Sequence, residues 1–90
     1  MTSMSVLIIG SGGREHALAI GLSQSPSIGS IHTAPGNAGT AILGTNHEID
    51  AMDIEGLVSL AQEISADLVV VGPEGPLVAG ISDRLREIGI

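Results

Sequence analysis

The sequence has no cysteine, no lysine and no phenylalanine, tyrosine or tryptophan. Without cysteine, neither a disulfide framework nor a thiolate metal site can form. The basic side chains are three arginines, and the formal net charge is −7. A nucleic-acid surface needs basic patches and often aromatic stacking platforms. The composition therefore argues against a nucleic-acid partner.

Long apolar runs are missing as well. No run approaches the roughly 18 residues that a membrane span needs, and the residues before Ser5 carry no positive side chain typical of a targeting segment. We therefore expect no membrane partner and a cytoplasmic protein. The three histidines, His16, His32 and His47, fall on separate predicted elements without ligand spacing, so we predict no metal site.

What the chain does have is a regular alternation of apolar strands and amphipathic helices. Its 90 residues make one domain at most. Continuous apolar runs and turn residues predict strands over 5–9, 30–33, 46–49 and 68–71, the third one weak. Helices are predicted over 14–24, over 54–64 with Asp50 as N-cap, and from Pro76 to Ile88, while 34–40 is predicted to be a loop.

This order predicts a three-layer, Rossmann-like α/β domain with a mostly parallel sheet and helices on both faces. We expect the strand order 3-2-1-4. Gly89 is typical of a helix end, and Ile90 of the first residue of a fifth strand, so we expect the chain to be a piece of a longer protein.

The glycine-rich stretch 10–14 joins the first strand to the first helix, an arrangement that points backbone N–H groups and a helix dipole at an anion. Arg14 lies in the first helical turn, where the dipole disfavours a cation, which suggests an anionic ligand such as phosphate. Ligands of such sheets bind outside the carboxyl ends of the strands where the chain reverses direction. The loops 10–14 and 72–76 should face each other there, with 35–40 beside them.

A dinucleotide is the first ligand to consider, because Gly10 and Gly12 begin the G-x-G-x-x-G pattern. The third glycine is replaced by Glu15, and the second strand ends in Thr33-Ala34-Pro35 without the acidic residue that holds the ribose. A P-loop is excluded because no Gly-Lys-Ser/Thr occurs.

Three long motifs resemble the N-terminal domain of the phosphoribosylamine–glycine ligase family: GSGGREHAL at 10–18, APGNAGT at 34–40 and VGPEGPLV at 71–78. The resemblance covers nearly the whole chain, with one departure at Gly75, where the family more often has alanine or aspartate. It implies a pre-ATP-grasp domain over 1–90 and a full enzyme of purine biosynthesis that joins glycine to 5-phosphoribosylamine with ATP, through a glycyl phosphate.

By this resemblance the domain would bind phosphoribosylamine, while glycine, ATP and Mg²⁺ (or Mn²⁺) would be held by downstream domains of the same chain. Arg14 and the N–H groups of Gly12 and Gly13 would hold the 5-phosphate or assist charge at the reacting end. Glu74 would accept hydrogen bonds from ribose hydroxyls, and Asn37 would line the mouth. No catalytic residue is expected within 1–90. The expected substrate-binding residues are Gly10, Gly12, Gly13, Arg14, Glu15, Pro35, Gly36, Asn37, Gly72, Pro73, Glu74 and Pro76.

Two other interpretations stay open at this point. One is a dinucleotide-dependent oxidoreductase domain. The other is a sugar-phosphate-binding module without catalysis, which only the sequence beyond Ile90 would separate from a ligase.

Overall fold

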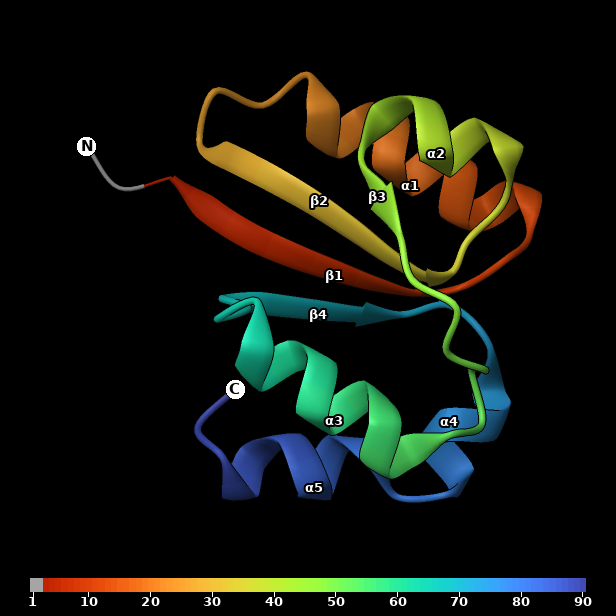
Figure 1. Ribbon diagram of the computed structural model, residues 1–90, viewed down its shortest axis with the longest axis vertical. Helices are drawn as coiled ribbons and strands as arrows, with labels where there is room; N and C mark the ends of the chain where they lie inside the picture. Colours follow the sequence, from red (N-terminus) through yellow and green to blue (C-terminus); the bar gives the residue numbers. More distant parts are fainter. Residues whose placement is uncertain (1–2) are drawn as a thin grey trace.

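The computed structural model describes residues 3–90 as four strands and five helices around one parallel sheet (Figure 1). The sheet has the order β3-β2-β1-β4, so the predicted fold class and strand order are confirmed. In chain order the elements are β1 (Met4–Gly10), α1 (Gly13–Ser23), β2 (Ile28–Pro35), α2 (Ala38–Leu43), β3 (Thr45–Asn46), α3 (Ile54–Glu63), β4 (Leu68–Val71), α4 (Glu74–Val78) and α5 (Ile81–Glu87).

Helices cover both faces of the sheet. Figure 1 shows α1 and α2 on one side and α3 with α5 on the other. Successive side chains of a strand point to opposite faces, and the central strand β1 is apolar on both. Leu7 and Ile9 join the cluster under α3 and α5, whereas Val6 and Ile8 join the cluster under α1.

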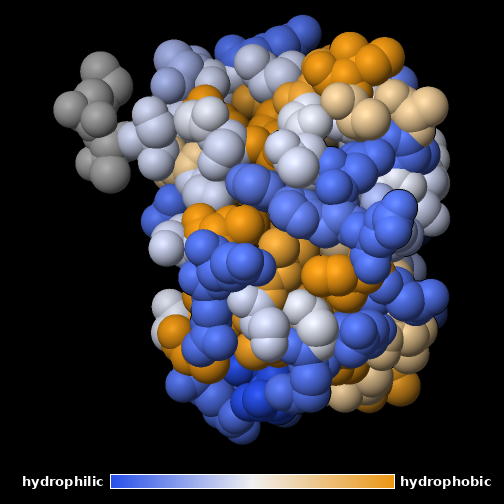
Figure 2. Space-filling model, viewed as in Figure 1, coloured by the Kyte–Doolittle hydropathy of each residue, from blue (hydrophilic) through white to orange (hydrophobic). Residues whose placement is uncertain are grey.

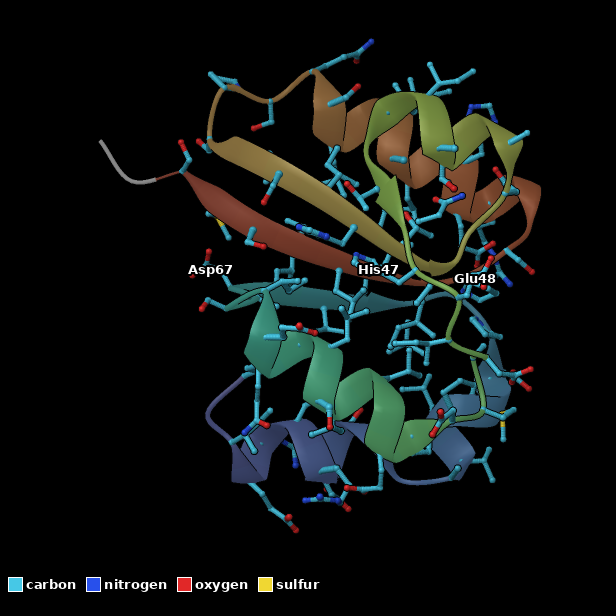
Figure 3. The ribbon with its side chains drawn as sticks, viewed as in Figure 1. His47, Glu48 and Asp67 are labelled. Carbon is cyan, nitrogen blue, oxygen red and sulfur yellow. The ribbon has the colours of Figure 1, made fainter. Side chains whose placement is uncertain are left out.

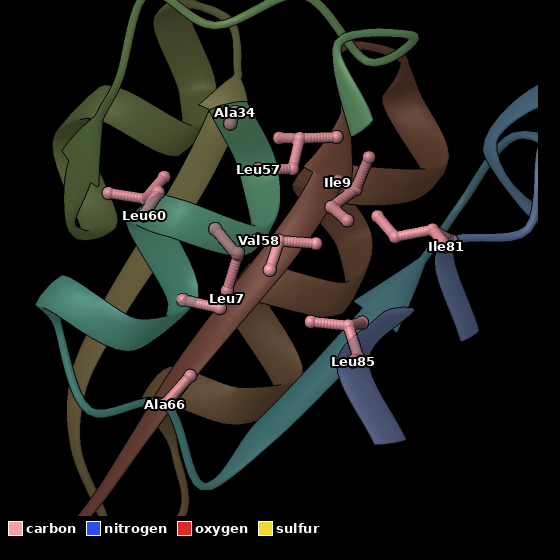
Figure 4. Packing of buried hydrophobic residues seen from close by; sticks show 10 residues of the cluster. Leu7, Ile9, Ala34, Leu57, Val58, Leu60, Ala66, Ile81 and Leu85 are labelled. Atoms are coloured by element: carbon pink, nitrogen blue, oxygen red, sulfur yellow. The ribbon is translucent and has the colours of Figure 1, made fainter. Parts of the chain in front are cut away.

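The larger cluster forms most of the core. Figure 4 shows Leu57 from α3 and Ile81 and Leu85 from α5 directed toward Leu7 and Ile9 of β1. Leu57 and Ile81 have no exposed surface. Burying an aliphatic side chain of this size contributes about 1.5–3 kcal/mol, so this layer supplies much of the stability.

The prediction of a loop over 34–40 is wrong. Strand β2 continues to Pro35, and the short helix α2 begins at Ala38. Asn37 is its N-cap, and the Asn37 side chain accepts a hydrogen bond from the Thr40 N–H at 3.0 Å. The turn-forming residues of this stretch therefore start a helix.

Two smaller predictions are corrected. Strand β3 covers only Thr45–Asn46 instead of 46–49. The N-cap of α3 is Asp53, which accepts from the Gly56 N–H at 3.1 Å, whereas Asp50 accepts from the Met52 N–H within the preceding turn.

The helix predicted from Pro76 to Ile88 is divided into α4 and α5. Gly80 separates them with a φ of 91°, a left-handed conformation that suits glycine. After α5 the chain turns at Gly89, and Ile90 packs against the larger cluster without belonging to a strand. The fifth strand stays a prediction.

The most exposed of the large apolar side chains in residues 3–90 lie on the short helices. Ile42 on α2 is 85% exposed and Val78 on α4 is 87% exposed, and Figure 2 shows apolar surface over both regions, at the upper and lower right. Within residues 3–90, no helix has the length and apolar character that crossing a membrane would require.

Candidate functional site

A pocket of about 330 Å³ lies at the carboxyl ends of the strands. It combines the loop after β1, the loop after β3 and the start of the loop after β4. The predicted approach of the loops 10–14 and 72–76 is therefore found. Its lining residues are Gly10, Ser11, Gly12, Arg14, Glu15, Ala51 and Pro73.

The N-terminus of α1 borders this pocket. Gly12 is the N-cap, and its N–H donates to Glu15 Oε2 at 2.8 Å. That N–H is therefore not available for a phosphate, which corrects the expectation for Gly12. The N–H groups of Gly13 and Arg14, in the first turn, have no acceptor among residues 3–90.

Arg14 differs from the other two arginines. Its side chain is exposed and forms no ion pair within the described part of the chain. Arg84 contacts Glu55 at 2.6 Å, and Arg86 lies 3.3 Å from Asp83. Arg14 is thus an exposed cation at the pocket that forms no ion pair within residues 3–90, as expected for an anion-binding residue, and the carboxylate of Glu15 lines the same pocket.

Glu15 was expected to contact substrate, but its side chain is only 4% exposed. It lies beneath the loops that end β1 and β4. A Cβ atom placed on Gly10 would lie 2.7 Å from Glu15 Oε1, and one on Gly72 only 1.6 Å from the same oxygen. Glu15 therefore belongs to the floor of the pocket.

Asn37 does not line an open mouth. Its Nδ2 donates to the carbonyl oxygens of Ser11 and Gly12 at 3.0 and 3.1 Å, while its Oδ1 accepts from Thr40. The amide is therefore used to fasten the loop after β1 to α2.

The neighbouring residues Pro35 and Gly36 continue this connection. The Gly36 N–H donates to the Gly10 carbonyl at 3.0 Å. Gly36 has a φ of 81°, and a Cβ there would lie 2.4 Å from Asn46 Oδ1. Both residues hold the backbone beside the pocket and do not line it.

Glu74 is exposed and begins α4, directly after the pocket residue Pro73. Its carboxylate has no hydrogen-bond partner within residues 3–90, whereas Pro76 is buried. At Gly75, the one departure from the family motif, a Cβ would lie 2.6 Å from the sulfur of Met52, an exposed and flexible side chain.

Ser11 and Ala51 are pocket residues that the sequence analysis missed. Ala51 lies between β3 and α3, in a stretch that we predicted as a helix start. Ala51 could have been predicted from the rule that ligands bind at the carboxyl ends of parallel strands, because the chain leaving β3 also emerges at that edge.

The histidines lie away from this pocket. His16 packs over α2, where a Cβ on Gly39 would lie 2.5 Å from the imidazole. His32 Nδ1 and His47 Nε2 are 2.9 Å apart, and Figure 3 shows His47 on the segment that leaves β3. Throughout residues 3–90, no three His, Cys, Asp or Glu side chains gather closely enough to hold a metal ion.

Residues 4–90 match the family model described as "Phosphoribosylglycinamide synthetase, N domain". Among curated relatives named phosphoribosylamine–glycine ligase, those of Mycobacterium tuberculosis (strain H37Rv) and Streptomyces coelicolor are 51% and 53% identical over 87 residues, which is 97% of this chain. The Caulobacter vibrioides relative is 51% identical over all 90 residues. The chain spans about 21% of the length of each relative. It belongs to the phosphoribosylglycinamide synthetase N-domain family.

Proposed function

We propose that this chain is the substrate-binding N-terminal domain of a phosphoribosylamine–glycine ligase. The full enzyme would join glycine to 5-phosphoribosylamine and convert ATP to ADP and phosphate, giving glycinamide ribonucleotide for purine biosynthesis. The observation that carries the proposal is the pocket at the carboxyl ends of the strands, with an arginine at its edge that forms no ion pair within residues 3–90.

The phosphate of the substrate would lie against the N-terminus of α1. Two N–H groups there, of Gly13 and Arg14, have no acceptor within residues 3–90, and the helix dipole favours negative charge at this end. The Arg14 guanidinium can add a charge-assisted hydrogen bond to a phosphate oxygen. A bound phosphate would thereby offset the unfavourable position of the Arg14 cation in the first helical turn.

Glu74 would bind the hydroxyl groups of the ribose. A carboxylate accepts hydrogen bonds from hydroxyl groups, and such charge-assisted bonds contribute about 1.5–3 kcal/mol each. Glu74 stands at the first position of α4 with Pro73 before it and the buried Pro76 after it, so its backbone is held firmly.

Glycine, ATP and Mg²⁺ would be bound outside residues 1–90. The relatives are about five times longer than this chain, since the chain spans 21% of them. We expect the chain alone to show no ADP release with glycine and phosphoribosylamine. Ligation by the full-length protein would also separate the ligase from a binding module without catalysis.

The dinucleotide alternative finds no support in the fold. The third position of the glycine pattern holds the buried Glu15. Strand β2 ends at Pro35, and the residue before the end is Ala34, so no carboxylate stands where the ribose of NAD would be held.

Steady-state kinetics of the full-length enzyme test the proposal. Arg14→Ala and Glu74→Gln should each raise the KM for phosphoribosylamine by about tenfold or more, because each loses more than about 1.4 kcal/mol of binding. The KM values for glycine and ATP should barely change. Arg86→Ala and Glu63→Gln are matched controls, because both side chains are exposed and lie outside the pocket. Unchanged KM for phosphoribosylamine in both test variants would refute the proposal.

A further inference from the structure

The side chain of Glu15 connects two loops that are far apart in the sequence. Its Oε2 accepts from the Gly12 N–H at 2.8 Å in the loop after β1. Its Oε1 lies against Gly72, at the end of β4, and is also close to Gly10. Because glycine has no side chain, Gly12 cannot return the usual capping bond, so Glu15 alone caps this end of α1.

The two glycines beside Glu15 make room for it. Replacing the hydrogen of Gly72 by a methyl group would place carbon 1.6 Å from Oε1, and at Gly10 the distance would be 2.7 Å. The backbone around these glycines is fixed as well, since the Gly72 N–H donates to the Ile9 carbonyl at 2.9 Å and the Gly36 N–H to the Gly10 carbonyl at 3.0 Å. These hydrogen bonds hold the backbone on both sides of the Glu15 carboxylate.

A buried carboxylate is costly unless it is compensated. One backbone N–H and the positive end of α1 compensate Glu15. A neutral apolar side chain would fill the same floor without this cost, so packing alone does not account for a glutamate. Its carboxylate does something more specific: it accepts the Gly12 N–H, while the N–H groups of Gly13 and Arg14 have no acceptor within residues 3–90.

We propose that Glu15 is a positioning residue that fixes the separation between two groups beside the pocket: the N–H groups of Gly13 and Arg14 at the start of α1, which would bind the phosphate, and Glu74, which follows the pocket residue Pro73 and would bind the ribose. It acts through the Gly12 N–H and through contact with Gly72, two residues before Glu74. This role rests on the proposed function. Glu15 acts from the floor of the pocket, and its carboxylate fills the space that a Cβ on Gly10 or Gly72 would need.

The experiment uses four variants of the full-length enzyme: Glu15→Ala, Glu15→Gln, Gly72→Ala and the double variant Glu15→Ala/Gly72→Ala. Gly21→Ala is the control for adding a methyl group, since a Cβ on Gly21 meets nothing within 4 Å. The melting temperature and the separate KM and kcat values are measured for each, with phosphoribosylamine, glycine and ATP varied in turn.

Glu15→Ala should raise the KM for phosphoribosylamine by about tenfold or more with little change in kcat, because small misplacements of binding groups are costly. Glu15→Gln keeps the size of the side chain and an acceptor for the Gly12 N–H, so it should raise the KM for phosphoribosylamine much less. Gly72→Ala should lower the melting temperature, and the double variant should recover much of that loss while its KM stays high. Such non-additivity is the sign of direct contact.

Each other outcome has a distinct meaning. Additive losses of melting temperature would overturn the contact between Glu15 and Gly72. A lower melting temperature with an unchanged KM in Glu15→Ala, while Arg14→Ala raises the KM, would make Glu15 merely structural. An equal KM rise in Glu15→Gln and Glu15→Ala would mean that the negative charge meets the substrate. If Arg14→Ala also left the KM unchanged, the proposed function would fail, whereas the melting temperatures would still report on the contact.

Discussion

The cluster between the sheet and the helices α3 and α5 contains ten buried apolar residues, whereas the cluster under α1 contains four. The buried polar side chains show the opposite distribution. Glu15 lies on α1 and Thr40 on α2. Thr33 is two residues after Ile31 on β2, so its side chain faces the α1 side of the sheet as Ile31 does. One half of the domain is held mainly by apolar burial, and the other depends on hydrogen bonds.

This difference bears on the candidate site. Its loop after β1 belongs to the polar half, and Asn37, in the segment after β2 beside the pocket, fastens this loop to α2 through the carbonyls of Ser11 and Gly12. Hydrogen bonds are directional, so they fix backbone positions more precisely than apolar contacts do. The apolar half supplies stability, and the polar half supplies a defined geometry near the pocket.

The largest effect should come from the apolar half. Leu57→Ala removes a fully buried side chain under the sheet, and such truncations cost about 2–5 kcal/mol. Urea denaturation of the chain measures this loss as a lower free energy of unfolding. Leu77→Ala is the matched control, because Leu77 is 48% exposed, and it should cost much less. Equal losses in the two variants would contradict the proposed division of the fold.

A smaller effect should come from the polar half. Thr40 is fully buried, and its Oγ1 accepts from the Asn37 N–H at 2.8 Å and lies 2.8 Å from Asn46 Oδ1. Thr40→Val keeps the shape but leaves these partners unsatisfied, at a cost of about 1–3 kcal/mol. The exposed Thr45→Val is the control in the same denaturation experiment. A loss no greater than that of the control would show that α2 does not depend on this network.

The same contrast explains which parts of the fold could be predicted. The apolar run of β1 and the helical spacing of Leu57, Val58 and Ala61 could be predicted, because the spacing of apolar residues in the sequence indicates which side chains are buried. Helix α2 is invisible to that reasoning, because it begins with a hydrogen-bonded Asn37 and presents the exposed Ile42 to solvent. The break at Gly80 was missed for a related reason, since the apolar spacing continues across it.

The location of the candidate site could be predicted from the sequence, but the contacts of some of its side chains could not. The glycine-rich loop and the switch-point rule place the loops together, as observed for Gly10, Arg14 and Pro73. Sequence reasoning treated Glu15 and Asn37 as substrate-binding residues because they occur in the same motifs. Their partners, Gly72 and the Ser11 carbonyl, are 57 and 26 residues away in the chain, and a contact of that range leaves no local pattern.

The smallest effect that we predict depends on pH and concerns His32 and His47. His32 is two residues before Ala34 on β2, so its side chain points to the face of the sheet that α3 and α5 cover. Its contact with His47 is therefore a polar contact on the mainly apolar side of the domain. Burial, together with the charge of His47, lowers the pKa of His32 below its ordinary value of 6.5. The unfolded chain therefore binds a proton at a higher pH than the folded chain does.

The sign follows from proton linkage. Where the unfolded state binds more protons, stability rises with pH, so the contribution of His32 is complete above about pH 6.5 and falls as the pH drops from there to its lowered pKa. Melting temperatures between about pH 5 and 7.5 should show this fall in the unaltered chain and a flatter profile in His32→Gln. His47→Gln should flatten it less, because burial is the larger cause of the low pKa. A His32→Gln profile parallel to that of the unaltered chain would mean that the pair has no part in the pH dependence.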